Sequence, residues 1–187
     1  LSKINTLGVM AIAANGIISR VDSFAIVPAQ NIGLGIMTYV AQARGAKQND
    51  IIKDIFKKGA IIELSFGAII FALLYTLKDS IMLFLSPKDS FEVIKIGSDY
   101  LSIMSFGYVL CAIVNTYQCF FRGMGNMSIT LYSSLIIVSV KVLFTYNFAD
   151  IWGLDAVAYG TIIGWIIMNT YAALMKKYYD KTKWSYY

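Results

Sequence analysis

Apolar residues come in long runs along the chain, each close to the length of a helix that crosses a membrane. Such a helix needs about 20 residues to span roughly 30 Å of hydrocarbon. Short polar segments separate the runs. The pattern predicts five spans, at residues 8–43, 59–77, 96–121, 127–148 and 154–175. The expected fold is therefore an all-α, polytopic transmembrane helix bundle.

The first span is too long for one upright helix, and a proline lies near its middle. Proline lacks a backbone N–H and kinks a helix, and membrane bundles tolerate such breaks. We therefore expect a tilted helix that is bent at Pro28. Residues 51–58 carry apolar side chains at helical spacing. This spacing predicts an amphipathic lead-in to the second span that lies along the inner membrane surface.

Composition agrees with a membrane protein. The chain has 187 residues, of which 58% are hydrophobic and 14% are charged. Soluble domains typically carry about a quarter charged residues. The formal net charge is +5, which could indicate a nucleic-acid partner. The charges, however, lie at the ends of apolar runs, so we expect the lipid bilayer as partner and no nucleic acid.

The basic residues predict the orientation of the spans, because cytoplasmic loops carry an excess of Lys and Arg. They gather in the loop at 44–58, in the turn at Arg122 and in the tail from Lys176. The opposite loops carry fewer lysines and several carboxylates. We therefore expect a multi-pass protein of the cell membrane with a cytoplasmic C-terminus. With five spans the N-terminus lies outside, which a missing preceding helix would explain.

Reactive groups are sparse. Cys111 and Cys119 lie two helical turns apart, about 12 Å along the axis, which is too far for a disulfide. The chain has no histidine, and the sequence contains no recognisable nucleophile–base pair, metal cluster or paired carboxylates. We expect neither an enzyme nor a bound metal or cofactor.

Polar residues inside the apolar runs are costly in lipid and usually face a bundle interior or a watery cavity. On the first span they share a face of about 100° of arc, namely Asn15, Ser19, Asp22, Ser23, Gln30 and Gly33. A second such face on the third span holds Ser105, Tyr108, Ala112, Asn115, Thr116 and Cys119. Two interpretations stay open: hydrogen bonds between packed helices, or the walls of a substrate cavity.

Three of the charged residues in the spans are interpreted individually. Asp22 could bind a cation or a proton, but we interpret it first as a residue near the outer membrane interface that is paired elsewhere. Lys141 lies deep in an apolar run, and we expect a cation in the bundle interior, either functional or in a structural ion pair. Glu63 is interpreted as an ordinary interfacial residue.

The last span repeats small residues that permit close helix packing, at Ala156, Gly160 and Gly164.

Three segments, in order, resemble the C-terminal lobe of the multidrug and toxic compound extrusion (MATE) transporters. IISRVDSFAIVPAQNIGLGIMTYVAQARGAK resembles a proline-bearing helix of that family that runs into a cytoplasmic turn. YQCFFRGMGNM is similar to the family's RG-x-G turn. WGLDAVAYGTIIGW resembles the start of the last helix, although Asp155 and Val157 depart from the family's pattern.

The resemblance implies that the five spans are helices eight to twelve of a twelve-helix fold, with helix seven and the N-terminal lobe as missing partners. It implies export of amphipathic or cationic organic compounds, such as drugs and toxins, in exchange for Na⁺ or H⁺. Part of the family uses a carboxylate eleven positions before the arginine of the RG turn, where this chain has Cys111. Lys141 matches a basic position that the family often has.

An apolar cation binds well to aromatic faces and methionine sulfur, with few directional demands. The candidate residues for substrate binding are Phe24, Gln30, Met37, Tyr108 and Asn115. Asp22 and Lys141 are the candidates for ion coupling or interior charge.

Other functions remain open. A lipid-linked oligosaccharide flippase of the same superfamily would need a more cationic cavity for pyrophosphate, for which only Lys141 and Arg20 are available in the spans. The chain could also be a non-transporting membrane subunit or assembly factor. The lack of clustered catalytic groups argues against a membrane enzyme.

Overall fold

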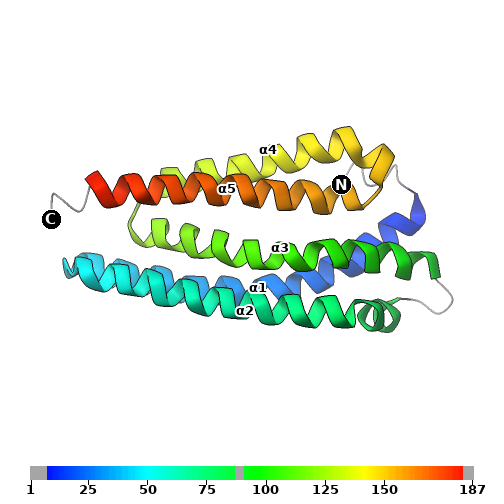
Figure 1. Ribbon diagram of the computed structural model, residues 1–187, viewed down its shortest axis with the longest axis horizontal. Coiled ribbons are helices and arrows are strands. Elements are labelled where there is room, and N and C mark those ends of the chain that lie inside the picture. Colours follow the sequence, from blue (N-terminus) through cyan, green and yellow to red (C-terminus); the bar gives the residue numbers. More distant parts are fainter. Residues whose placement is uncertain (1–7, 87–90, 183–187) are drawn as a thin grey trace.

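The computed structural model describes residues 8–86 and 91–182, which form five long helices with short connections. The helices are α1 (Val9–Gly45), α2 (Asn49–Leu85), α3 (Phe91–Gly123), α4 (Met127–Trp152) and α5 (Asp155–Thr182). Consecutive helices run in opposite directions along the long axis of the molecule (Figure 1). The described part of the chain contains no β-strand.

All five helices are long and apolar enough to cross a membrane. The shortest, α4, has 26 residues, or about 39 Å at 1.5 Å per residue, against roughly 30 Å of hydrocarbon. The prediction of a five-span helical bundle is therefore confirmed. α1 continues through Pro28 without interruption.

The predicted lead-in at 51–58 is not a separate helix on the membrane surface. It forms the first turns of α2. Ile52 is fully buried, and Ile55 and Phe56 pack against the same core as residues of α1 and α3. The prediction was wrong because the apolar spacing of 51–58 also matches the face that α2 presents to its neighbours.

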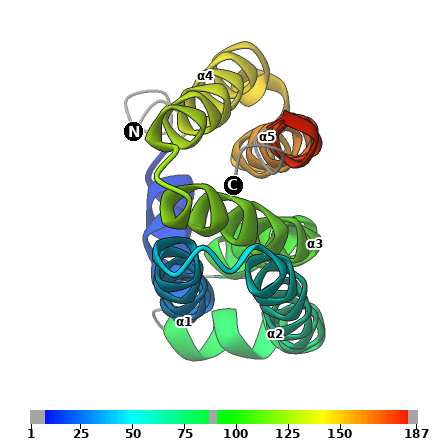
Figure 2. The same cartoon turned by 90° about the vertical axis from the view of Figure 1, so that its left-hand side faces the viewer.

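α3 lies at the centre of the bundle. Figure 2 shows α1 and α2 on one side of α3, and α4 and α5 on the other. The turns at 46–48 and 124–126 lie at the same end of the bundle as the C-terminal end of α5 (Figure 1). The fold thus brings the basic segments to one end, as the predicted topology requires. Which side of the membrane this end faces stays a prediction.

Two apolar clusters follow one another along the bundle. The first takes residues of α1 up to Ala25 and of α3 up to Val114. The second begins at Ile36 on α1 and at Cys119 on α3. Between these limits, Asn115 of α3 contacts Ala29 of α1, whereas Asp22 and Tyr108 lie alongside the first cluster. The contact of Asn115 with Ala29 therefore lies between the two apolar clusters.

Candidate functional site

The first polar contact joins α1 to α3. The hydroxyl of Tyr108 donates a hydrogen bond to the Asp22 carboxylate. Tyr108 is buried and Asp22 is half-buried. The prediction that Asp22 is paired elsewhere is therefore confirmed, with a phenol as the partner. A half-buried carboxylate in an apolar bundle needs such a donor, because an unpaired charge is costly in this environment.

Lys141 brings a positive charge from α4 toward this carboxylate. It is half-buried, and its charge and that of Asp22 attract one another. No direct salt bridge joins the two side chains in the described part of the chain. Asp22 and Lys141 therefore connect α1 to α4 through electrostatic attraction without a direct contact. Opposite charges placed in this way reduce the cost of each in a membrane.

A second polar contact joins three helices. The Asn115 side-chain amide of α3 donates to the backbone oxygen of Ala29 on α1 at 2.7 Å. The same nitrogen donates to Glu63 Oε1 on α2 at 2.6 Å. Its oxygen accepts from the Cys119 thiol at 3.6 Å. These three contacts set the orientation of the amide. Asn115 therefore forms hydrogen bonds between packed helices, which is the first of the two interpretations given for the polar face of α3.

Glu63 was wrongly expected to be an ordinary interfacial residue. Its side chain is fully buried, and it is held by the Asn115 amide. A signal for this position was present in the sequence: Gly59 and Gly67 lie one turn before and one turn after Glu63. Such small residues let backbones approach closely, so this face of α2 is the one that packs against α1 and α3.

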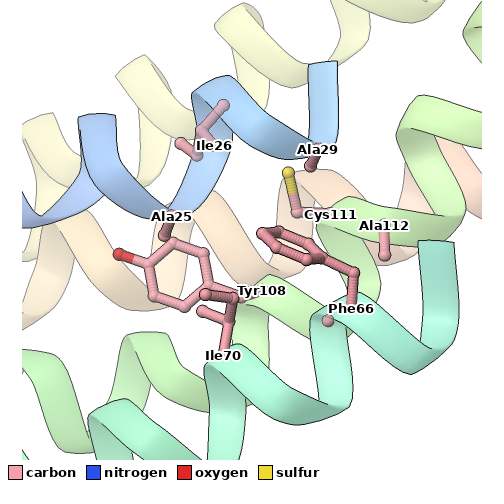
Figure 3. A pocket seen from close by; sticks show the side chains of 9 residues that line it. Ala25, Ile26, Ala29, Phe66, Ile70, Tyr108, Cys111 and Ala112 are labelled. Atoms are coloured by element: carbon pink, nitrogen blue, oxygen red, sulfur yellow. The ribbon is translucent and has the colours of Figure 1, made fainter. Parts of the chain in front are cut away.

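A small cavity lies between the two polar contacts. Its lining comes from three helices: Ala25, Ile26 and Ala29 of α1, Phe66, Gly67 and Ile70 of α2, and Tyr108, Cys111 and Ala112 of α3. In Figure 3 the Tyr108 and Phe66 rings lie between α1 and α2, and the Tyr108 hydroxyl points toward α1. The space open to water is about 10 Å³, about the minimum for one water molecule.

The remaining predicted site residues do not join this cluster. Phe24 is 83% exposed, and Gln30 is exposed as well. Met37 lies beside the second apolar cluster, fifteen residues after Asp22 and so about 22 Å along the helix. The structure thus groups Asp22 with Tyr108, places Asn115 with Glu63, and leaves Phe24 and Gln30 on the surface of this lobe. Their roles in substrate binding stay predictions.

The described residues contain no group of three or more His, Cys, Asp or Glu side chains that could hold a metal ion. Cys111 and Cys119 are both free thiols, so the prediction that they form no disulfide is confirmed. Cys111 lines the cavity beside Tyr108. A thiol therefore occupies the position at which the resemblance implies a carboxylate, and the Asp22 and Glu63 carboxyl groups of the two polar contacts lie on α1 and α2.

Comparison with known protein families now decides the classification. The family model described as MatE matches residues 2–147, which is most of the chain. The chain belongs to the MatE family. The resemblance noted from the three sequence segments is therefore confirmed, and the match extends from the region of α1 into α4.

Two curated relatives agree with this assignment. The chain is 27% identical over 128 residues to the probable multidrug resistance protein YoeA of Bacillus subtilis. It is 24% identical over 142 residues to the probable multidrug resistance protein NorM of Halalkalibacterium halodurans. The matches cover 68% and 72% of this MatE-family chain, but only 27% and 31% of the two relatives. The chain thus spans about a third of their length.

Solved structures show the same fold. An outward-facing multidrug resistance MATE family transporter of the MOP superfamily matches 97% of the chain with a TM-score of 0.85, at 18% identity. An inward-facing structure of such a transporter matches 88% of the chain with a TM-score of 0.81, at 19% identity. The chain covers 39% and 37% of those two chains. The five helices therefore have the arrangement of part of a MATE transporter.

Proposed function

We propose that this chain forms part of one lobe of a membrane exporter that moves amphipathic organic cations out of the cell, driven by a gradient of Na⁺ or H⁺. Membership of the MatE family supports the proposal, as do the multidrug resistance names of the two curated relatives. The observation that carries it is the Asp22–Tyr108 hydrogen bond, which holds a carboxylate inside an apolar bundle. A structural protein has no evident need for this arrangement, whereas a transporter of cations does.

Asp22 supplies the negative charge of the site. Lys141 attracts it from α4, and a coupling ion or a cationic substrate would compete for the same charge. Two ligands that compete for one carboxylate weaken each other's binding, and this effect is reciprocal. Exchange of an inbound ion for an outbound organic cation requires a competition of this kind.

The faces around the site suit an apolar cation. Tyr108 places an aromatic ring beside the carboxylate, although this ring is buried in the five-helix bundle, and Phe24, on α1 like Asp22, offers an exposed ring. Cation–π contacts contribute about 0.5–2 kcal/mol each and make few directional demands. We infer that Phe24 and Gln30, which are exposed on this lobe, face the substrate pathway between the lobes.

Transport by the full-length protein tests the proposal. The protein is reconstituted in liposomes loaded with ethidium or tetraphenylphosphonium, and a Na⁺ gradient and a pH gradient are imposed separately. We expect one gradient to drive movement of the organic cation, and collapse of that gradient to stop it. If neither gradient drives movement of either probe, the proposed function is wrong.

Variants then connect transport to this lobe. Asp22→Asn removes the charge at constant shape and should lower efflux about tenfold, equivalent to about 1.4 kcal/mol. Asp79→Asn changes an exposed carboxylate of α2 and should leave efflux unchanged. Tyr108→Ala and Gln30→Ala should alter the range of exported compounds. Unchanged efflux in all three site variants at normal expression would exclude these residues from the pathway.

A further inference from the structure

Glu63 is a fully buried carboxyl group that the proposed transport site does not use. One of its oxygens, Oε1, accepts the Asn115 amide at 2.6 Å. The other, Oε2, is buried and has no hydrogen-bond partner. No lysine or arginine of the described residues forms an ion pair with it. An ionised carboxylate in this position would have one unpaired oxygen and no counter-charge, which is very costly in a low-dielectric interior.

The groups around Glu63 explain why a proton, and not a metal ion, neutralises it. The α3 groups that it influences are the thiols of Cys111 and Cys119. The nearest α1 contacts of this junction are the backbone at Ala29 and Gly33, which cannot titrate. Asp22 acts on Cys111 from the other side of the cavity. Asn115 presents its amide hydrogens toward Glu63. A cation such as Na⁺ would meet these hydrogens instead of oxygen ligands.

We propose that Glu63 is a proton-binding site of this lobe, and that its proton controls how Asn115 holds α1 and α2 against α3. In the protonated state the neutral carboxyl group accepts the amide, and the amide also binds the Ala29 carbonyl. The proton on Glu63 therefore stabilises the junction of α1, α2 and α3.

Loss of this proton requires space for water. The junction is tightly packed at Gly33, where a Cβ atom would lie 2.5 Å from Asn115 Nδ2. A small cavity is lined by Ala29 and by Gly67, one turn after Glu63. We expect deprotonation to admit water by widening this cavity and separating α2 from α1. A change in the protonation of Glu63 therefore changes how α1 and α2 pack against the face of α3 that carries Tyr108 and Asn115.

Infrared spectroscopy of the full-length protein tests proton binding without any need for transport. A protonated carboxyl group that is shielded from water gives a carbonyl band separate from those of carboxylates. We expect such a band in the wild-type protein at neutral pH and its loss in Glu63→Gln, which keeps the acceptor for Asn115. Glu92→Gln, at an exposed position of α3, should keep the band. If the band is missing in the wild type, or persists in a folded Glu63→Gln variant, the proposal is wrong.

Transport supplies the second measurement, which rests on the proposed function. Glu63→Gln mimics the protonated state, so its efflux of ethidium should lose its pH dependence and fall about tenfold, within the range typical of coupling between sites. A full pH dependence in this variant would overturn the proposal.

Should Glu63→Gln fail to fold, Glu63→Asp keeps a titratable group, and its infrared band should persist at a shifted frequency. If the wild type moves no organic cation, the proposed function fails, and the infrared experiment still decides the role of Glu63.

Discussion

The central helix α3 and the outer helix α4 are packed very differently. Half of the most apolar stretch of α3 is buried in the bundle, compared with 11% of that of α4. The junction of α1, α2 and α3 contains fully buried polar groups such as Glu63 and Ser105. The α4–α5 hairpin instead stacks aromatic rings along α4, including Phe148 and Trp152 with ring centroids 5.1 Å apart. α3 therefore forms the interior of the bundle, whereas α4 presents most of its surface outward.

The glycines show the same difference. A Cβ atom on Gly123 of α3 would lie 2.7 Å from the Met37 backbone oxygen on α1. On the α4–α5 side, a Cβ atom on Gly164 would lie 3.4 Å from the Ile137 backbone oxygen, an ordinary contact. The α1–α3 contact therefore depends on the missing side chain. The repeat of small residues on α5 permits close packing, as predicted. Gly164 tolerates one more carbon, whereas a Cβ atom on Gly160 would lie 3.2 Å from Phe144 Cβ, which is a tighter contact.

Gly123→Ala should have the largest effect on stability. The new methyl group meets a backbone atom that cannot move without shifting α1, and overpacking of this kind costs about 1–3 kcal/mol. Gly164→Ala should be neutral or stabilising, because alanine favours a helix by about 1 kcal/mol relative to glycine. Thermal unfolding of the purified full-length variants in detergent measures both. A similar loss of stability in both variants would remove the contrast between the two sides.

The next largest effect concerns the attraction between the two sides. Lys141→Met should destabilise the protein, because it leaves Asp22 without the positive charge that attracts it. When Asp22→Asn is combined with Lys141→Met, the double variant no longer has the uncompensated charge, and it should regain part of the lost stability. We expect a coupling of about 0.5–1 kcal/mol, the lower part of the range for neighbouring charged residues. Strictly additive effects in the double variant would show that α4 is electrostatically independent of α1.

Much of the fold could be predicted from the sequence. Each apolar run became a helix, because a span of about 20 apolar residues has few alternatives in a membrane. The ends of the helices could not be predicted, since the apolar runs do not mark them. α2 continues well beyond 59–77 at both ends, where charged residues such as Lys53 and Asp79 are compatible with a helix outside the hydrocarbon.

The candidate site could be predicted only in part. The periodicity of α3 placed Tyr108 and Asn115 on one face, and the structure shows both in contacts with α1. Periodicity within one helix does not say which neighbour a face meets, so the pairing of Asp22 with Tyr108 could not be derived. Glu63 was missed because it lies near the start of the predicted span 59–77, where a single carboxylate is usually interfacial. Its flanking glycines were the signal, and they gain meaning only once α2 is packed on α1 and α3.

The smallest predicted effect lies at the basic end of the bundle, where α5 contacts the opposite side. The Lys176 ammonium group lies 4.6 Å from the centre of the Phe56 ring and 5.6 Å from that of Phe120. Lys176→Met keeps the length of the side chain and removes the charge, and with it the ion pair of Lys176 with Asp180 at 2.8 Å. The loss should be about 0.5–1 kcal/mol, to which the ion pair contributes about 0.3–0.5 kcal/mol and the cation–π contact the rest. Lys177→Met, at the exposed neighbouring position, is the matched control. Equal thermal shifts in the two variants would mean that the aromatic contact does not fasten α5 to α2, and that the two sides meet only through α3.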